Sequence, residues 1–244
     1  MAAVIDRLSG AIIAAGRGER LRAASNGVPK PLVEVGGDPL LLRQARSIIN
    51  VGASPVHAII NTETAGVIHD RGLAMPPEID LCVRDTTNSM ESLLALGDRI
   101  APGHFLMTTV DAVIAPAELA RFTARALELV NPFKGQALDG ALGVVPWRGD
   151  RHPLFAKVEP DGTIGALGDH ESALVTAGVY LFSTRIFSFR DKAHAAGLDA
   201  MRRYLSLLIS EGMRFAAVEL ADVIDVDEAA DLEAARALVA IQGG

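Results

Sequence analysis

Apolar residues in the first half of the chain form short continuous runs, separated by segments of mixed polarity. Four such runs cover residues 11–15, 56–60, 79–83 and 105–110. Runs of this length that are apolar on both faces are typical of buried parallel strands. After Asn88, the residues Met90, Leu93 and Leu94 recur at helical spacing, which predicts an amphipathic helix. Strands that alternate with helices predict an α/β fold with a mostly parallel sheet, whose ligands bind beyond the carboxyl ends of the strands.

The pattern changes near residue 140. Strand-like runs follow at 142–145, 154–158 and 175–182. A tight turn, Glu159-Pro160-Asp161-Gly162, separates two of them, which predicts a small antiparallel insertion. Helical spacing returns over 201–208, a strand is expected at 215–218, and a last helix places Leu232, Ala235 and Leu238 on one face. Repeats and linkers are absent from the sequence, so we expect residues 1–244 to form one domain.

Composition excludes several classes of protein. Half of the 244 residues are hydrophobic and the formal net charge is -7, which disfavours binding to nucleic acid or to anionic membranes. No run approaches the roughly 20 apolar residues needed to span a bilayer, and residues 1–7 carry an acid where a secretion signal carries bases. The single cysteine, Cys82, fits a reducing compartment. We therefore expect a cytoplasmic protein.

A glycine-rich loop follows the first predicted strand, in the sequence Ala14-Ala15-Gly16-Arg17-Gly18-Glu19-Arg20. Glycines allow close approach of the backbone to an anion, and consecutive N–H groups can bind phosphate. A Gly-x-Gly after a strand also occurs as a simple turn. Downstream, Pro29-Lys30-Pro31 holds one lysine between two residues that stiffen the backbone, so that little packing is expected to depend on it. A solvated loop lysine is the alternative.

Together these two motifs resemble the signature of the nucleotidyltransferases that join a nucleoside triphosphate to a phosphorylated sugar or alcohol. The resemblance implies a Rossmann-like three-layer sandwich related to the GT-A fold. It also implies that Gly16, Arg17 and Gly18 wrap the triphosphate and that Ala14 and Ala15 lie near the base. Arg20 and Lys30 would neutralise the phosphates. Glu19 departs from the Thr or Ser that is common at this position in the family.

Three aspartates follow predicted strands. Asp111 ends the run Leu106-Met107-Thr108-Thr109-Val110, and Asp225 and Asp227 precede the last helix. From the residues alone, an Asp after a strand is more often a turn or cap residue, and Asp227 is a default helix N-cap. The resemblance implies that Asp111 and Asp225 bind Mg²⁺, with Asp227 as a third candidate. The chain lacks a second acid at position 113, where glycosyltransferases of this fold have one.

Two further segments resemble parts of the family. Asn88-Ser89-Met90-Glu91-Ser92-Leu93 is similar to a stretch of the cytidylyltransferase branch, so Asn88 and Ser92 are nucleotide-binding candidates, although helix capping explains Asn88 equally well. Gly178 resembles a small residue beside the acceptor pocket, and a β-bulge is the alternative. The Val-Glu-Lys-Pro element of hexose-1-phosphate enzymes is absent, and residues 169–171 read Asp-His-Glu.

The sequence thus predicts a Mg²⁺-dependent nucleotidyltransferase that acts on a nucleoside triphosphate and a small phosphorylated substrate, with a slight preference for CTP over UTP or GTP. The alternatives are a GT-A-type glycosyltransferase and a non-catalytic nucleotide-binding protein. The histidines show no metal-ligand spacing, and Trp147 is interpreted as a packing residue. The sequence makes no prediction of the oligomeric state.

Overall fold

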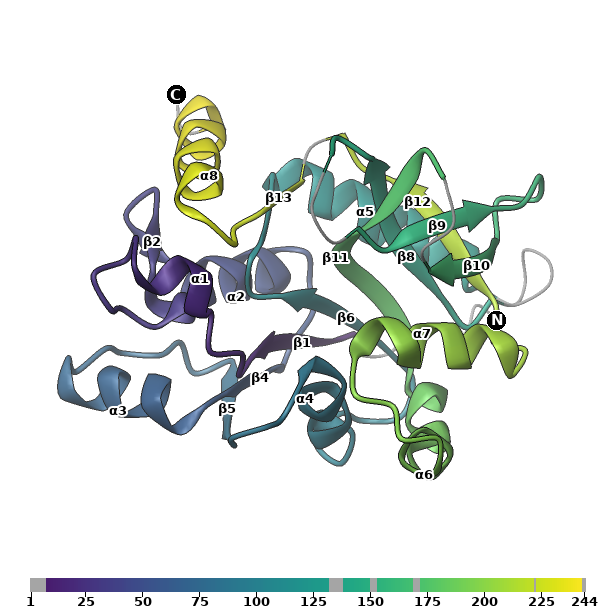
Figure 1. The fold of residues 1–244 in the computed structure, drawn as a ribbon, viewed down its shortest axis with the longest axis horizontal. Coiled ribbons are helices and arrows are strands. Elements are labelled where there is room, and N and C mark those ends of the chain that lie inside the picture. The colour runs from purple at the N-terminus through teal and green to yellow at the C-terminus, as the bar shows by residue number, and fades with distance from the viewer. Residues whose placement is uncertain (1–7, 132–137, 150–152, 169–171, 222, 243–244) are drawn as a thin grey trace.

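The computed structural model of the protein describes residues 8–131, 138–149, 153–168, 172–221 and 223–242. The N-terminal residues 1–7, His152 and the segment 169–171 discussed above lie outside this part of the chain. A mixed sheet forms the centre of the molecule, with helices on both of its faces (Figure 1). This is the predicted three-layer α/β arrangement, with a mostly parallel sheet and smaller antiparallel parts.

Within the described residues the central sheet has nine strands, in the order β10-β9-β11-β6-β1-β4-β5, with β8 beside β11 and β12 beside β8. These strands are β1 (Ser9–Ala14), β4 (Val56–Ile60), β5 (Ile79–Val83), β6 (His104–Thr109), β8 (Gly140–Pro146), β9 (Phe155–Val158), β10 (Ile164–Gly168), β11 (Leu174–Ser183) and β12 (Phe215–Glu219). The strands β1, β4, β5 and β6 are mutually parallel. Their carboxyl ends therefore meet at one edge, where the predicted site residues lie.

Two apolar clusters cover the two faces of the sheet. The first contains buried residues of α2 (Leu40–Asn50), α5 (Pro116–Leu129) and α8 (Ala229–Gln242), and α3 (Thr62–Asp70) packs against it. The second contains residues of α4 (Ser89–Leu96), α6 (Arg190–Ala195) and α7 (Met201–Ser210). The helical turn α1 (Glu19–Arg22) follows β1 directly. The strands of β1, β4 and β6 are almost wholly buried because both faces are covered, as their continuous apolar runs predict.

The strands that follow residue 140 are antiparallel only in part. The strands β8 and β9 run antiparallel to β11, and β10 to β9, but β12 returns parallel to β8. The tight turn at Glu159 joins β9 to β10, a strand that the hydrophobic pattern did not predict. Its burial alternates irregularly, and the pairing of β10 with β9 contains a register shift, so its sequence has no clear period.

Two short ladders stand apart from the main sheet. The first joins β2 (Glu34–Val35) to β3 (Asp38–Pro39), and the second joins β7 (Ala112–Ile114) to β13 (Val223–Asp225). Strands of two or three residues are too short for a periodic pattern, so the sequence did not reveal them. The second ladder matters for function because it carries Asp225 to the end of β6.

Trp147 was interpreted as a packing residue, and it does pack against another ring, although it lies at the surface. Its residue surface is 47% exposed, and its ring packs edge-on against Phe155 with 5.3 Å between centroids. Across the described residues, no helix combines the length and apolar character that a membrane crossing requires.

Candidate active site

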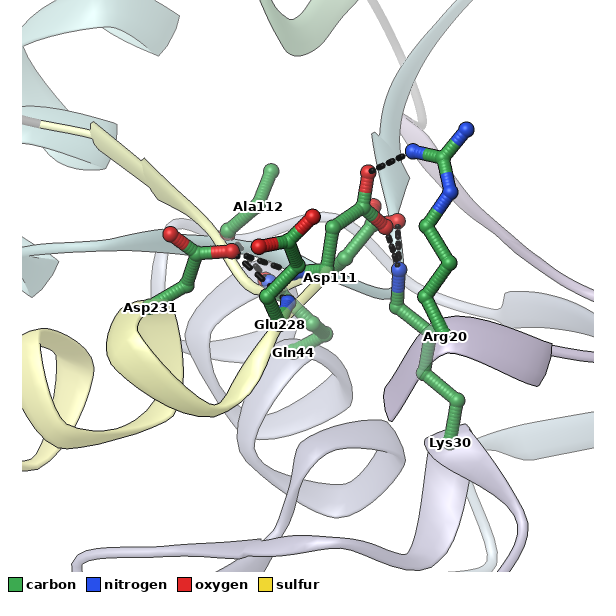
Figure 2. Close-up of polar contacts among 8 residues, drawn as sticks. Arg20, Lys30, Gln44, Asp111, Ala112, Glu228 and Asp231 are labelled. Carbon is green, nitrogen blue, oxygen red and sulfur yellow. Dashed lines mark hydrogen bonds and ion pairs between the residues drawn. The ribbon is translucent and has the colours of Figure 1, made fainter. Parts of the chain in front are cut away.

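Lys30 lies at the centre of a cluster of charged side chains at the carboxyl edge of the sheet (Figure 2). Its Nζ donates to Oδ2 of Asp111 at 2.6 Å and to Oδ1 of Asp227 at 2.5 Å. A guanidinium nitrogen of Arg20 lies 3.8 Å from the other oxygen of Asp227. Four of the residues predicted from the sequence therefore come together.

Burial of Lys30 differs from the expectation for a proline-bordered loop. Only 8% of the lysine side chain is exposed, and Pro31 and Leu32 of the same 3₁₀ turn are also buried. Burial alone lowers the pKa of an ammonium, but the charge of Asp111 and the hydrogen bonds to both aspartates outweigh it, so the pKa of Lys30 is raised. Lys30 is a paired, structural cation as well as a candidate phosphate ligand.

The carboxylates of Asp111 and Asp225 lie close enough for the charge of Asp111 to affect the ionisation of Asp225. Removal of Asp111 from water opposes its ionisation, but the neighbouring Lys30 ammonium dominates and lowers the pKa of Asp111. Partial burial and the negative charge of Asp111 raise the pKa of Asp225 well above its ordinary value. Asp225 as a whole residue is exposed, so we attribute its raised pKa mainly to the like charge of Asp111.

The ladder between β7 and β13 explains how two distant acids become neighbours. Asp225 is the register partner of Ala112, the residue after Asp111. The Val226 N–H donates to the Asp111 carbonyl at 3.1 Å. Strand pairing and a backbone hydrogen bond thus hold the two acidic segments next to each other.

The cap of α8 differs from the prediction. Asp231, in the first turn of the helix, accepts from the N–H groups of Asp227 and Glu228 at 3.0 and 2.7 Å. The side chain of Asp227 accepts from Lys30 instead. The N-cap interpretation of Asp227 is therefore wrong, and its carboxylate belongs to the charged cluster.

The glycine loop packs against Lys30. Gly18 has a φ of 59°, and a Cβ added there would lie 2.6 Å from the Cβ of Lys30. Only glycine fits this position, because it satisfies the left-handed backbone and leaves room for the lysine. Gly16 has open space around it. The backbone N–H groups of Gly16 and Arg17 donate to no other described residue, so they remain available to an anion.

Asn61 holds the start of this loop and was not found from the sequence. Its side chain donates to the carbonyl of Ala15 at 3.2 Å and accepts from the N–H of Thr64, where it caps α3. Both Ala14 and Ala15 are buried, so neither residue exposes much surface to a ligand. The signal was a polar residue at the end of an apolar strand, the same signal that singled out Asp111.

Two residues predicted to bind nucleotide, Asn88 and Ser92, form hydrogen bonds within the protein. Asn88 caps α4 by accepting from the Glu91 N–H at 3.0 Å. Ser92 is 2% exposed, with its hydroxyl 2.7 Å from that of Thr86. Both residues shape the segment after β5, which ends at the same edge as Asp111.

Gly178 lies at a bulge in β11, where the register with β8 shifts. Its φ is 68°, and an added Cβ would lie 2.5 Å from the Thr109 hydroxyl and 3.0 Å from the Cβ of Ala112. Thr109 also contributes to the lowered pKa of Asp111. Gly178 thus lies at a β-bulge and leaves the space that Thr109 and Ala112 occupy, and its place beside the acceptor stays a prediction.

The carboxylates of Asp111 and Asp225 fit Mg²⁺ as a pair of oxygen ligands. Among the described residues, no three His, Cys, Asp or Glu side chains gather closely enough to enclose a metal ion. Asp111 and Asp225 nevertheless place two hard oxygen donors side by side, a like-charge pair that a cation relieves. Mg²⁺ commonly takes only one or two carboxylates from a protein, together with substrate phosphates and water.

Residues 10–177, which contain the glycine loop, Lys30 and Asp111, match the family described as the MobA-like NTP transferase domain. The chain belongs to this family. Asp225 and Asp227 lie beyond the matched residues, and the structure alone brings them to the same site.

One relative has a similar sequence over most of this chain. It is the CMP-5'-(3-aminopropyl)phosphonate synthase of Streptomyces rubellomurinus, which is 28% identical over 229 residues. The match covers 88% of this chain but only 35% of that protein. The chain thus spans about a third of the relative's length.

Solved structures share the fold of this family member. The inositol-1-phosphate CTP transferase from T. maritima has a TM-score of 0.76 at 17% identity, covering 98% of this chain and 97% of that one. A CTP:phosphocholine cytidylyltransferase from Streptococcus pneumoniae has a TM-score of 0.71 at 19% identity, covering 96% and 99%. At these identities the likeness extends to the fold alone.

Proposed function

We propose that this protein is a Mg²⁺-dependent nucleotidyltransferase that joins a nucleoside triphosphate to a small phosphorylated or phosphonylated acceptor and releases pyrophosphate. The observation that carries the proposal is the contact of the buried Lys30 with Asp111 and Asp227, directly beside the glycine loop. This contact supports the proposal because it holds a cation and two carboxylates, the kind of group that Mg²⁺ takes as a ligand, beside the loop that contains the N–H groups of Gly16 and Arg17.

The reaction needs no covalent enzyme intermediate. An oxygen of the acceptor's phosphate attacks the α-phosphorus, a new P–O bond forms, and the bond from that phosphorus to the β-phosphate oxygen breaks. Pyrophosphate carries away the bonding electrons. Catalysis then consists of alignment and charge neutralisation.

Each site residue has a task in this scheme. The N–H groups of Gly16 and Arg17 and the side chain of Arg20 bind the triphosphate, and Lys30 neutralises charge on the departing phosphates. Asp111 and Asp225 hold Mg²⁺, and Asp227, which pairs with Lys30, is a third candidate ligand. When bound, the cation supplies charge neutralisation of the phosphate oxygens.

The substrates follow from the comparisons by analogy. The names of the Streptomyces relative and of two solved structures include a CMP product or CTP. We therefore favour CTP, with Asn88 and Ser92 near the base and the region of Gly178 near the acceptor. The acceptor would be an alcohol phosphate, a sugar phosphate or an alkylphosphonate. UTP or GTP with a sugar-1-phosphate is the second candidate.

Pyrophosphate release tests the proposal. The protein is incubated with each of the four triphosphates, MgCl₂, and one of phosphocholine, inositol-1-phosphate, 3-aminopropylphosphonate or glucose-1-phosphate. We expect acceptor-dependent pyrophosphate with CTP and loss of it in Lys30→Met. Thermal shifts with the four triphosphates give a second measure: equal stabilisation by all four, or a clear preference for GTP, contradicts the cytidylyl assignment.

Two outcomes favour the alternatives. Transfer of sugar from a nucleotide-sugar without pyrophosphate release identifies a glycosyltransferase. Saturable binding of nucleotide without turnover across the acceptor panel favours a non-catalytic protein. The wild-type protein and Lys157→Met, which makes the same chemical change at an exposed lysine, serve as references.

A further inference from the structure

Gln44 is a polar residue in the apolar interior, and the reaction scheme above does not use it. It lies in α2 with 2% of its surface exposed, on the helix face that packs into the first core cluster. A buried amide costs free energy unless its hydrogen bonds are satisfied. Gln44 therefore needs a partner within the core.

That partner is the backbone beside Asp111. The side-chain Nε2 of Gln44 donates to the carbonyl oxygen of Ala112. Figure 2 shows Gln44 and Ala112 on one side of Asp111, and Lys30 and Arg20 on the other. Since the Val226 N–H donates to the preceding carbonyl, that of Asp111, two donors from distant parts of the chain fix two successive peptide groups.

We propose that Gln44 is a positioning residue for Asp111, which it holds in place through the Ala112 carbonyl. The Ala112 carbonyl belongs to the 112–113 peptide, and a shift of this peptide would move the adjoining Asp111, whose carboxylate meets Lys30 and, on the proposed function, the metal ion. Asp111 is the last residue before β7 begins, so its own backbone lies outside a long strand ladder. Gln44 adds a restraint from the helix layer to the short ladder of β7 and β13.

A purely structural role is the competing explanation. A methionine has nearly the shape of glutamine but no donor, so Gln44→Met leaves the Ala112 carbonyl unsatisfied while the core stays filled. Ile48→Val is the matched control, because Ile48 is fully buried in the same helix and contacts no acidic residue of the site through a hydrogen bond. If stability alone were at stake, both substitutions would change only the melting temperature.

The first experiment is a crystal structure of Gln44→Met without ligands. We expect the Asp111 carboxylate to leave hydrogen-bonding distance of Lys30 Nζ, now 2.6 Å, and Ile48→Val to keep it. An unchanged Lys30–Asp111 contact in Gln44→Met overturns the proposal. This result needs no turnover, so it stands apart from failure of the proposed function, which would appear as absence of pyrophosphate release in the wild-type protein.

The second experiment measures metal dependence. Loss of a residue that orients a metal ligand typically costs about 10–100-fold in metal affinity or activity. We expect the Mg²⁺ concentration for half-maximal rate to rise about 10-fold in Gln44→Met, with kcat reduced and KM for the triphosphate changed less. Mn²⁺ binding with a non-cleavable α,β-methylene CTP should weaken in parallel. Loss of melting temperature equal to that of Ile48→Val, with unchanged metal dependence, contradicts the proposal.

A second variant covers failure to fold. Gln44→Asn keeps an amide but is one methylene too short to reach the same carbonyl, and it leaves room for water. We expect it to fold and to show the same change in metal dependence as Gln44→Met. If neither variant folds, Gln44 serves the stability of the core and the positioning role is wrong.

Discussion

The ammonium of Lys30 lies 2.6 Å from the carboxylate of Asp111, although 81 positions separate the two residues in the chain. The same ammonium reaches Asp227, which is 197 positions away. One buried cation thus connects the loop after β1, the end of β6 and the entry to α8. The stability and the chemistry of the site are therefore coupled.

Replacement of Lys30 should lower both the catalytic rate and the stability of the protein. In Lys30→Met, we expect kcat to fall by roughly two orders of magnitude, about 3 kcal/mol, because a charged donor to the transferring phosphates is lost. The melting temperature without metal should also fall, since the carboxylates of Asp111 and Asp227 lose their counter-ion. Steady-state pyrophosphate release and thermal unfolding measure the two effects.

Divalent cations should rescue part of that stability. We expect Mn²⁺ to raise the melting temperature of Lys30→Met more than that of wild type, because the ion replaces the missing positive charge. The surface variant Lys157→Met should show neither effect. Activity of Lys30→Met within a few-fold of wild type would remove Lys30 from the reaction.

The two adjacent acids should respond oppositely in stability. Asp111→Asn breaks a buried ion pair, so it should lower the melting temperature without metal. Asp225→Asn removes a carboxylate whose pKa the neighbouring charge raises, so at neutral pH it should raise the melting temperature.

Both variants should still need more Mg²⁺ for half-maximal rate, because each loses a hard oxygen ligand. Asp161→Asn, at a surface turn, is the control. If only one of the two substitutions in the acidic pair changes the metal dependence, these acids do not share an ion.

Gly178 offers a test of close packing. Gly178→Ala should destabilise the protein by about 2 kcal/mol or more, because it combines a left-handed backbone with a collision at Thr109. Gly162→Ala is matched: its φ is 81°, but an added Cβ meets nothing within 4 Å. Urea unfolding should give the larger loss for Gly178→Ala, and equal losses would show that the contact with Thr109 carries no energy.

His104 should make the fold sensitive to acid. Burial lowers the pKa of this histidine, and the opposing charge of Asp139 does not offset it. The unfolded chain then binds a proton more readily than the folded protein, so stability is lost as pH falls below the ordinary histidine pKa of about 6.5. We expect the difference in unfolding free energy between pH 7.5 and 5.5 to shrink in His104→Gln. Identical pH dependence in both proteins would assign the acid sensitivity elsewhere.

Local patterns were sufficient for much of the architecture. The strands β1, β4, β5 and β6 and the helix after Asn88 were predicted from apolar runs and helical spacing, because burial on both faces leaves a clear signal within a few residues. Short or irregular strands were missed for the same reason. The ladder of β7 and β13 depends on pairing between segments more than a hundred residues apart.

The sequence by itself determined the fold class, the glycine loop, Lys30 and the acids at strand ends. Only the tertiary structure decided that Lys30 is buried between two carboxylates, that Asp231 rather than Asp227 caps α8, and that Gln44 reaches the backbone beside Asp111. The first set follows from local chemistry. The second depends on which elements pack together, since a hydrogen bond between distant residues leaves no period or spacing in the chain.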